Sequence, residues 1–368
     1  MKIVSFVHAI ASCWNNGNAH FLRGLGLSLQ AQGQEMLYCE PRGSWSETNL
    51  LQDHGPAALA SFRATFPTLK VEKYDPAQPD LDRLTDGADL VIVHEWNDPA
   101  LVNALGQKRA RGAAFSLLFH DTHHRAATAP EEMRRFDLSG YDGVLAFGES
   151  IAEIYRARGW AKHVWAFHEA ADTRTFYPPG ATRECDVVWI GNWGDEERSA
   201  ELRELLVEPA QSLNLHAVLY GVRYPDAVVE DLKSRRVEYR GWLPNHEAPL
   251  AFAKAAFTVH VPRGPYARAL SGIPTIRVFE ALACGIPLIS APWEDSETLF
   301  PPDCYLTAGD GNEMRAQMSA ILQDTGLREE LARNGLAAIA ARHTCDHRAA
   351  QLLDICASLN AAPERQAA

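Results

Sequence analysis

Three histidines in the first third of the sequence could exchange protons with a substrate. His8, His94 and His120 each end a short apolar run, and Asp121 comes directly after the third. Histidine titrates near neutral pH, and a neighbouring carboxylate can orient or charge the ring. We therefore predict that His120 and Asp121 meet a substrate, with His8 and His94 as alternatives for that position. A metal site in the polar segment 120–124 is disfavoured, because adjacent loop residues rarely converge on one ion.

A second distinctive segment predicts a helix that starts near Pro274 and ends at Gly285. Proline is favoured in the first helical turn and glycine just past the last, and the free N–H groups of a first turn attract anions. Glu280 lies among apolar residues of this helix. A carboxylate in such surroundings needs hydrogen-bond partners, and polyol hydroxyls would serve. The alternative is a glutamate on a solvated face of the helix.

Arginines near glycine-containing turns of the same half could supply positive charge. They are Arg198, Arg223, Arg263 and Arg268. Guanidinium groups suit the recognition of a diphosphate because they donate several hydrogen bonds in a fixed plane. Any one of them alone would be an ordinary surface residue, so we predict that a subset converges on phosphate groups.

Alternating strands and helices must position these residues. In the first half, short apolar runs alternate with helical patterns, and residues 89–94 and 114–120 are typical of strands buried on both faces of a parallel sheet. After a turn-rich segment at 177–182 the alternation starts again. This order predicts two Rossmann-like, doubly wound α/β domains that face a cleft, with ligands at the carboxyl ends of the strands. The predicted domains are 1–178 and 179–342, followed at 343–368 by a helix that could pack back on the first domain and by a frayed tail.

Composition and charge exclude several classes of protein. The chain has 368 residues with a formal net charge of −12, so a basic surface for duplex DNA is not expected. No apolar run approaches the ~18 residues of a membrane span, although peripheral membrane contact stays open. Residues 2–8 predict a strand and not a signal peptide, because His8 interrupts an already short apolar run. The seven cysteines show no framework spacing, which favours reduced thiols and a cytoplasmic protein.

Residues 274–290 resemble the donor-site signature of group 1 glycosyltransferases, which have the GT-B fold. The likeness is closest to the branch of spore-maturation-type glycosyltransferases. It covers most of residues 140–345, is strongest around 258–293 and is weak before 120. Further stretches that agree are 168–172, 191–193, 241–244 and 260–263.

The resemblance implies a nucleoside-diphosphate sugar on the second domain and an acceptor hydroxyl on the first, with transfer that retains configuration and needs neither a metal nor another cofactor. It assigns Glu280 to the ribose, the backbone near Leu243 to the base, and the amides of Thr275 and Ile276, with Arg263 or Arg268, to the diphosphate. Taken together with the residues singled out above, the candidate catalytic residues are His120, Asp121, Arg263 and Arg268. The candidate donor-binding residues are Gly191, Asn192, Trp193, Arg198, Arg223, Leu243, Thr275, Ile276, Arg277 and Glu280.

One position departs from the common form of this motif. A second glutamate usually stands eight residues before Glu280, near the donor sugar, and here that position is Gly272. The motif therefore leaves the donor sugar and the retaining outcome open. The sequence also leaves open the nucleotide base, the oligomeric state and the acceptor, which could be a glycan, a lipid or a small molecule.

Two other functions remain compatible with the same resemblance. One is an epimerase of sugar nucleotides with the same fold, and the other is a sugar-nucleotide-binding protein without catalytic activity. A nicotinamide-dependent enzyme is disfavoured. The glycines at 24 and 26 lie inside a predicted helix and the third glycine of the dinucleotide fingerprint is missing.

Overall fold

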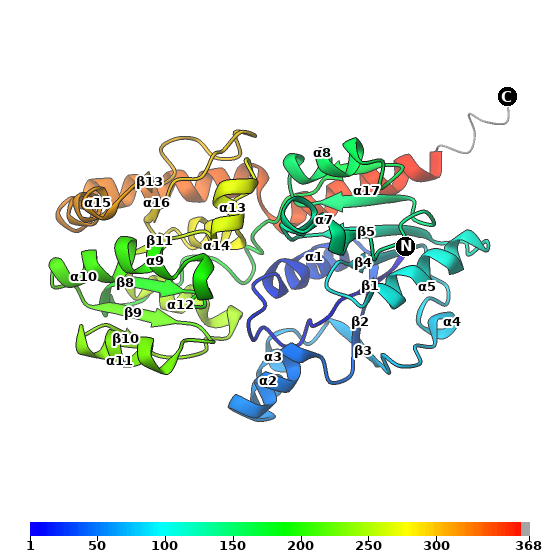
Figure 1. The fold of residues 1–368 in the computed structure, drawn as a ribbon, viewed down its shortest axis with the longest axis horizontal. Coiled ribbons are helices and arrows are strands. Elements are labelled where there is room, and N and C mark those ends of the chain that lie inside the picture. Colours follow the sequence, from blue (N-terminus) through cyan, green and yellow to red (C-terminus); the bar gives the residue numbers. More distant parts are fainter. Residues whose placement is uncertain (362–368) are drawn as a thin grey trace. The chain divides into compact units, whose positions relative to one another are not determined.

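A computed structural model describes residues 1–361, apart from the side chain of Asp195, so the expected frayed tail lies outside the described residues. The chain forms two compact units, each built on one parallel sheet (Figure 1). The first unit comprises Met1–Glu169 and the C-terminal helix that begins at Cys345, and the second comprises Ala170–Thr344. The turn-rich segment 177–182 lies inside the second unit. Among the described residues, no helix combines the length and apolar character needed to cross a membrane.

The first unit has a seven-stranded sheet in the order β3-β2-β1-β4-β5-β6-β7, and all neighbouring strands are parallel. The strands are β1 Lys2–Phe6, β2 Glu35–Pro41, β3 Lys70–Tyr74, β4 Leu90–His94, β5 Ser116–Asp121, β6 Gly143–Ala146 and β7 Val164–Ala166. The helices are α1 Ala19–Ala31, α2 Trp45–His54, α3 Ala57–Thr65, α4 Leu81–Leu84, α5 Pro99–Ala110, α6 Arg125–Thr128, α7 Pro130–Met133, α8 Glu149–Ala157 and α17 Cys345–Ala361.

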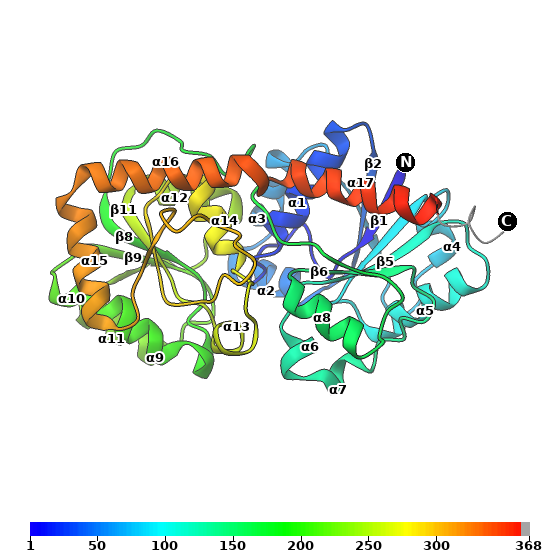
Figure 2. The same cartoon turned by 90° about the horizontal axis from the view of Figure 1, so that it is seen from above.

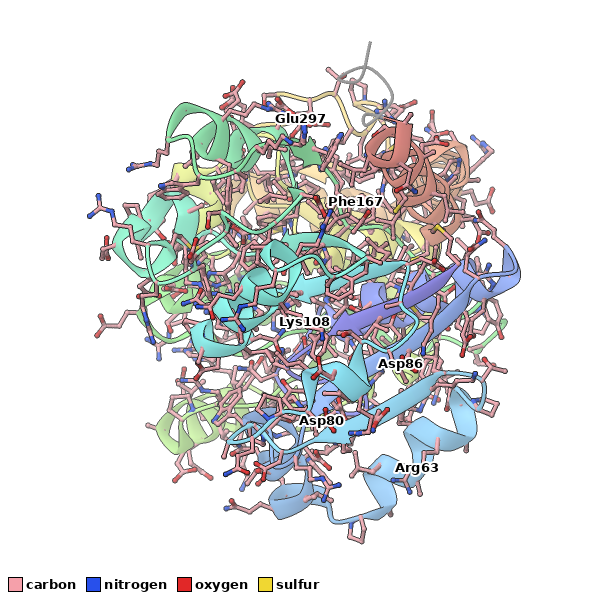
Figure 3. All side chains as sticks on the ribbon, turned by 90° about the vertical axis from the view of Figure 1, so that its right-hand side faces the viewer. Arg63, Asp80, Asp86, Lys108, Phe167 and Glu297 are labelled. Carbon is pink, nitrogen blue, oxygen red and sulfur yellow. The ribbon has the colours of Figure 1, made fainter. Side chains whose placement is uncertain are left out.

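Apolar strands and capped helices explain this architecture. Every residue of β4 is buried, as expected for a central strand covered by helices on both faces. At the start of α5, the side chain of Asp98 accepts a hydrogen bond from the Ala100 N–H, and Pro99 stands in the first turn. Charged pairs lie on the outer surface. Lys108, which is labelled in Figure 3, is paired with Asp82.

The C-terminal helix α17 completes the first unit. It packs against α1, although more than 310 residues separate the two helices in the chain (Figure 2). Leu352, Ile355 and Cys356 are buried on its inner face. Burial of apolar side chains therefore holds the end of the chain on the unit formed by its beginning.

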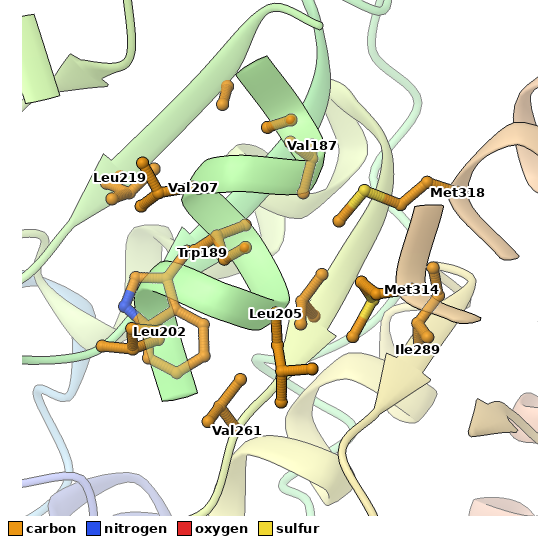
Figure 4. Packing of buried hydrophobic residues seen from close by; sticks show 14 of the residues in the cluster. Val187, Trp189, Leu202, Leu205, Val207, Leu219, Val261, Ile289, Met314 and Met318 are labelled. Carbon is orange, nitrogen blue, oxygen red and sulfur yellow. The ribbon is translucent and has the colours of Figure 1, made fainter. Parts of the chain in front are cut away.

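The second unit has a six-stranded parallel sheet in the order β10-β9-β8-β11-β12-β13. Its strands are β8 Cys185–Ile190, β9 Ala217–Tyr220, β10 Glu238–Tyr239, β11 Ala255–His260, β12 Leu288–Ser290 and β13 Leu306–Thr307. Its α-helices are α9 Ser199–Leu202, α10 Glu208–Ser212, α11 Asp226–Ser234, α12 Ala248–Ala253, α13 Gly264–Ala269, α14 Ile276–Ala283, α15 Gly311–Gln323 and α16 Thr325–Arg342. One face of the sheet packs on a core that includes Trp189, Leu205 and Met318 (Figure 4).

Strand order reverses once in each sheet, next to the strand that starts the unit. In the first unit the reversal falls between β1 and β4, and in the second it falls between β8 and β11. Loops that leave the carboxyl ends of two such strands run in opposite directions and open a crevice for ligands. The candidate site residues should therefore be sought after β1 and β4, and after β8 and β11.

Candidate functional site

A buried histidine connects the sheet of the second unit to the start of α14. His260 ends β11, and its Nδ1 lies 2.8 Å from Ser290 Oγ at the end of β12. Its Nε2 lies 3.0 Å from Thr275 Oγ1, directly before α14. Because Ser290 Oγ donates to the Ala291 carbonyl, it accepts from Nδ1–H, and Nε2 then accepts from the Thr275 hydroxyl. Burial and the nearby charges of Arg198 and Arg277 lower the pKa of His260 to about 3, so the ring is neutral.

The first turn of α14 is placed to bind an anion. Thr275 occupies the N-cap position, but its side chain makes no capping hydrogen bond because its hydroxyl is directed to His260. The amides of Ile276 and Arg277 in that turn have no carbonyl partner within the helix. Such amides, together with the helix dipole, favour a negatively charged ligand. The sequence placed the start of this helix two residues earlier, at Pro274.

Two arginines converge on Asn192 in the loop that follows β8. Arg198 donates to the Asn192 carbonyl at 2.6 Å and to its Oδ1 at 2.7 Å, and Arg263 donates to the same Oδ1 at 3.2 Å. The Arg198 guanidinium also lies 5.0 Å from the ring of Trp189, and its Nε is buried without a partner. Burial and the charge of Arg263 lower the pKa of Arg198 to about 10. An anion at this place would offset the repulsion between the two guanidinium groups.

Glu280 has a partner within its own helix. Its side chain is fully buried, and Oε2 accepts a hydrogen bond from the Arg277 guanidinium one turn earlier. The pair explains how a carboxylate is accommodated among the apolar residues of α14. The structure thus supplies a partner other than the ribose to which the resemblance assigned this residue.

A side chain at Gly272 would need a positive φ and would displace two neighbouring side chains. The φ of Gly272 is +76°, and a Cβ atom at this position would lie 2.8 Å from Ser296 Oγ and 2.9 Å from Glu297 Oε1. The Gly272 N–H donates to the Glu294 carbonyl at 2.6 Å, which holds the turn against the segment after β12. The space beside this position is therefore filled by the side chains of Ser296 and Glu297.

Other residues expected at the donor site have structural surroundings of their own. Trp193 is only 3% exposed and packs against Tyr224 in the hydrophobic core, so its ring anchors the loop after β8 to that core. The Arg268 side chain is 71% exposed and lies 4.0 Å from Glu201. Arg223 is exposed, and Leu243 is half-buried in the segment that follows β10. Of the four arginines singled out from the sequence, Arg198 and Arg263 share the partner Asn192.

The first unit brings the three predicted histidines to one edge of its sheet. His94 and His120 are paired across β4 and β5, with ring centroids 5.3 Å apart, and His8 lies 6.4 Å from His94. His120 Nε2 and His8 Nδ1 are buried without hydrogen-bond partners. Burial lowers the pKa of His120 to about 3 and that of His8 to about 4, so both are neutral at physiological pH. The expectation of a common rim is confirmed.

Asp121 does not orient His120, contrary to the interpretation of the sequence. Its carboxylate accepts from the Tyr155 hydroxyl at 2.8 Å and from the His123 N–H at 3.0 Å. His120 instead packs against Phe21 and Phe167. Consecutive residues of a strand point to opposite faces of the sheet, and this alternation separates the two side chains.

A buried glutamate was missed by the sequence analysis. Glu95 follows β4 directly, is fully buried, and accepts hydrogen bonds from Thr122 Oγ1 at 3.2 Å and from the Arg125 guanidinium. Burial and the proximity of Asp121 raise the pKa of Glu95. The available signal was a polar side chain where an apolar strand ends, and the same signal identified His94, the last residue of β4.

Within residues 1–361, no group of three or more His, Cys, Asp or Glu side chains is arranged to hold a metal ion. The second unit can bind an anion through the first turn of α14 and the guanidinium groups near Asn192. The first unit offers neutral imidazoles that can accept a hydrogen bond from a hydroxyl.

Comparison with known proteins agrees with this arrangement. Residues 198–354 match a family of glycosyl transferase-like domains. No curated protein matches the sequence. Among solved structures, the sucrose-phosphate synthase of Thermosynechococcus elongatus is 16% identical with a TM-score of 0.65, covering 98% of this chain and 100% of that one. HepE of Anabaena in complex with UDP and glucose is 16% identical with a TM-score of 0.64, and the match covers 97% of this chain and 100% of HepE.

A third similar structure is an alpha-glucosyltransferase in complex with UDP and a 13-mer DNA, 13% identical with a TM-score of 0.68 over 97% of this chain and 99% of that one. At these identities the likeness establishes the fold, and the protein has the GT-B fold that the sequence predicted. The enzyme class predicted from the sequence, a glycosyltransferase, is borne out by the family match. The narrower likeness to the spore-maturation-type branch stays a prediction.

Proposed function

We propose that this protein transfers a sugar from a UDP-sugar to an acceptor hydroxyl, with retention of configuration and without a metal. The observation that carries the proposal is that Arg198 and Arg263 meet at Asn192 in the second unit, while the charges of Arg198 and of Arg277, in the first turn of α14, both act on His260. UDP as the nucleotide is supported by the similar structures that contain it. A sugar transferase must stabilise the diphosphate that departs, and fixed positive groups do so without reorganising.

His260 has a positioning role in this proposal. Its neutral ring orients the Thr275 hydroxyl at the start of α14, and the amides of that turn face the leaving diphosphate. Because guanidinium groups and helix amides supply positive charge, a divalent cation is not needed for charge balance. Abolition of transfer by a chelator would contradict this part of the proposal.

On the acceptor side, a neutral histidine of the first unit accepts the proton or hydrogen bond of the attacking hydroxyl. His8 is half-buried and therefore the most accessible of the three, whereas His94 and His120 are almost completely buried. The Nδ1 of His8 is buried, so the exposed edge of the ring is the part that can meet a hydroxyl. Asp121 does not take this role, because its carboxylate already accepts a hydrogen bond from the Tyr155 hydroxyl.

Titration of the full chain with UDP, GDP, dTDP, ADP and CMP tests the donor site. A second experiment incubates the protein with the UDP-sugar, with and without acceptors. Arg263→Ala should weaken UDP binding on the order of 10–100-fold, since a hydrogen bond to a charged group contributes about 1.5–3 kcal/mol. Arg240→Ala is the matched control: Arg240 is paired with Glu238 as Arg263 is paired with Glu197, but its other partner is Tyr220 and not Asn192. Conversion of the free UDP-sugar would favour the epimerase, and binding without transfer or hydrolysis would favour the non-catalytic protein.

The ribose role of Glu280 is a separate part of the proposal. If Glu280 binds the ribose, removal of the 3′-hydroxyl of UDP should weaken binding to the wild type but not further weaken binding to Glu280→Ala. Additive losses would leave Glu280 as the structural partner of Arg277.

A further inference from the structure

An exposed tryptophan stands on a rigid turn at the rim that carries the histidines. Trp96 is 44% exposed, whereas its neighbours Glu95 and Asn97 are buried. The Asn97 amide donates to the carbonyls of Phe6 and His94, both at 2.8 Å. The turn therefore cannot rotate to bury the indole without breaking these bonds, and the exposure is built into the fold.

The surroundings of Trp96 fix the ring and leave it bordered by polar groups. The Arg125 guanidinium lies 4.5 Å from the ring centroid over one face, and the imidazole of His123 meets the ring edge-on at 4.8 Å. His8 lies 6.3 Å away, with its buried Nδ1 unpartnered. Arg125 covers part of the indole and His123 packs against it, while 44% of Trp96 stays exposed to a ligand.

This combination matches the chemistry of a sugar ring. A pyranose has an apolar C–H face that stacks on an aromatic ring, and hydroxyls at its edge that need polar partners. A lipid chain would need a longer apolar groove than one indole surrounded by Glu95, Arg125 and imidazoles. A nucleic acid would need basic groups for its phosphates, yet Arg125 is paired with Glu95 and the chain carries a net charge of −12.

We propose that the acceptor is a carbohydrate and that its terminal sugar packs on the exposed part of Trp96 while a hydroxyl binds the exposed edge of the half-buried His8 ring. This assignment rests on the proposed function, because a bound sugar is an acceptor only if the protein is a glycosyltransferase. The binding surface itself is defined within the first unit and does not depend on the donor site.

The test is saturation-transfer NMR on the full chain with methyl glucoside, methyl galactoside, methyl mannoside, maltose and lactose as probes. Sugar C–H protons should be saturated in the wild type, and Trp96→Ala should weaken that binding on the order of tenfold, with Trp96→Phe intermediate. Trp45→Ala is the matched control, because Trp45 is a 53% exposed tryptophan of the same unit on α2. A short-chain phosphatidylcholine and a single-stranded DNA oligomer serve as alternative ligands.

The inference is overturned if no sugar binds, if Trp96→Ala and Trp45→Ala give equal signals, or if only the phospholipid or the DNA depends on Trp96. UDP binding by the second unit, measured on the same samples, shows that each variant is folded and keeps the two hypotheses apart. If UDP binds normally but sugar binding does not change in Trp96→Ala, this inference alone is refuted. Sugar binding that depends on Trp96 without any UDP binding would refute the proposed donor site alone.

Discussion

At the scale of single residues, Gly272 has a backbone conformation that other residues rarely adopt. We expect Gly272→Ala to destabilise the second unit more than Gly241→Ala, since both positions have nearly the same φ, +76° and +74°, but only Gly272 has atoms within 4 Å of its Cβ direction. The conformational part should be about 1–2 kcal/mol for each, with a smaller addition at Gly272 for displacing the side chains of Ser296 and Glu297. Urea unfolding measures both. Equal losses would mean that Ser296 and Glu297 move aside easily.

His120 makes the stability of the first unit depend on pH. Its pKa is about 3 in the folded protein and about 6.5 in an unfolded chain, so the folded state binds fewer protons between these values. Stability from this group is therefore complete above pH 6.5 and is lost as pH falls toward 3, by up to about 1.4 kcal/mol per pH unit.

His120→Phe should keep the stability at pH 7.5 and flatten the loss between pH 6.5 and 4, because a phenyl ring suits the contacts with Phe21 and Phe167. His54→Phe, on the exposed end of α2, should leave the slope unchanged. Denaturant unfolding at several pH values gives the slopes. An unaltered acid slope in His120→Phe would assign the effect to other groups.

At the scale of elements, the start of α14 depends on the contact between Thr275 and His260. Thr275→Val keeps the shape of the side chain but removes the hydroxyl that His260 Nε2 accepts from. We expect UDP affinity to fall on the order of tenfold, because the first turn loses its orientation and the ring nitrogen is left unpaired. Isothermal titration calorimetry measures it, with Thr307→Val on the exposed end of β13 as the control. Equal affinity in both variants would show that α14 is held by packing alone.

At the scale of the whole molecule, the C-terminal helix α17 belongs to the unit formed by the beginning of the chain. Leu352 is fully buried in α17, so Leu352→Ala should cost about 2–5 kcal/mol in the stability of the first unit. Asp354→Ala, on the exposed side of the same helix, should cost almost nothing. Calorimetry with and without UDP separates the units, because a ligand raises the transition of the unit that binds it. UDP should raise the midpoint temperature of the second unit's transition. If Leu352→Ala lowers that same transition, the assignment of α17 to the first unit is wrong.

The order of elements and several site features followed from the sequence alone. Strand composition, the histidines at strand ends and the glycine and proline that bound α14 are local properties, so they could be recognised without knowing what packs nearby. The common rim of His8, His94 and His120 followed in addition from the parallel sense of the strands, which the alternation with helices implied.

Only the tertiary structure decided which of these groups meet. Tyr155, the partner of Asp121, lies 34 positions further along the chain, and Arg198 and Arg263 share Asn192 because β8 and β11 are neighbours in the sheet although β9 and β10 come between them in sequence. Trp96 is exposed because Asn97 and Glu95 are fixed by residues from other strands and loops. Such contacts depend on strand order and loop path, which hydrophobic periodicity does not encode; the sequence therefore determined the fold and the residue types of the site, and packing determined their partners.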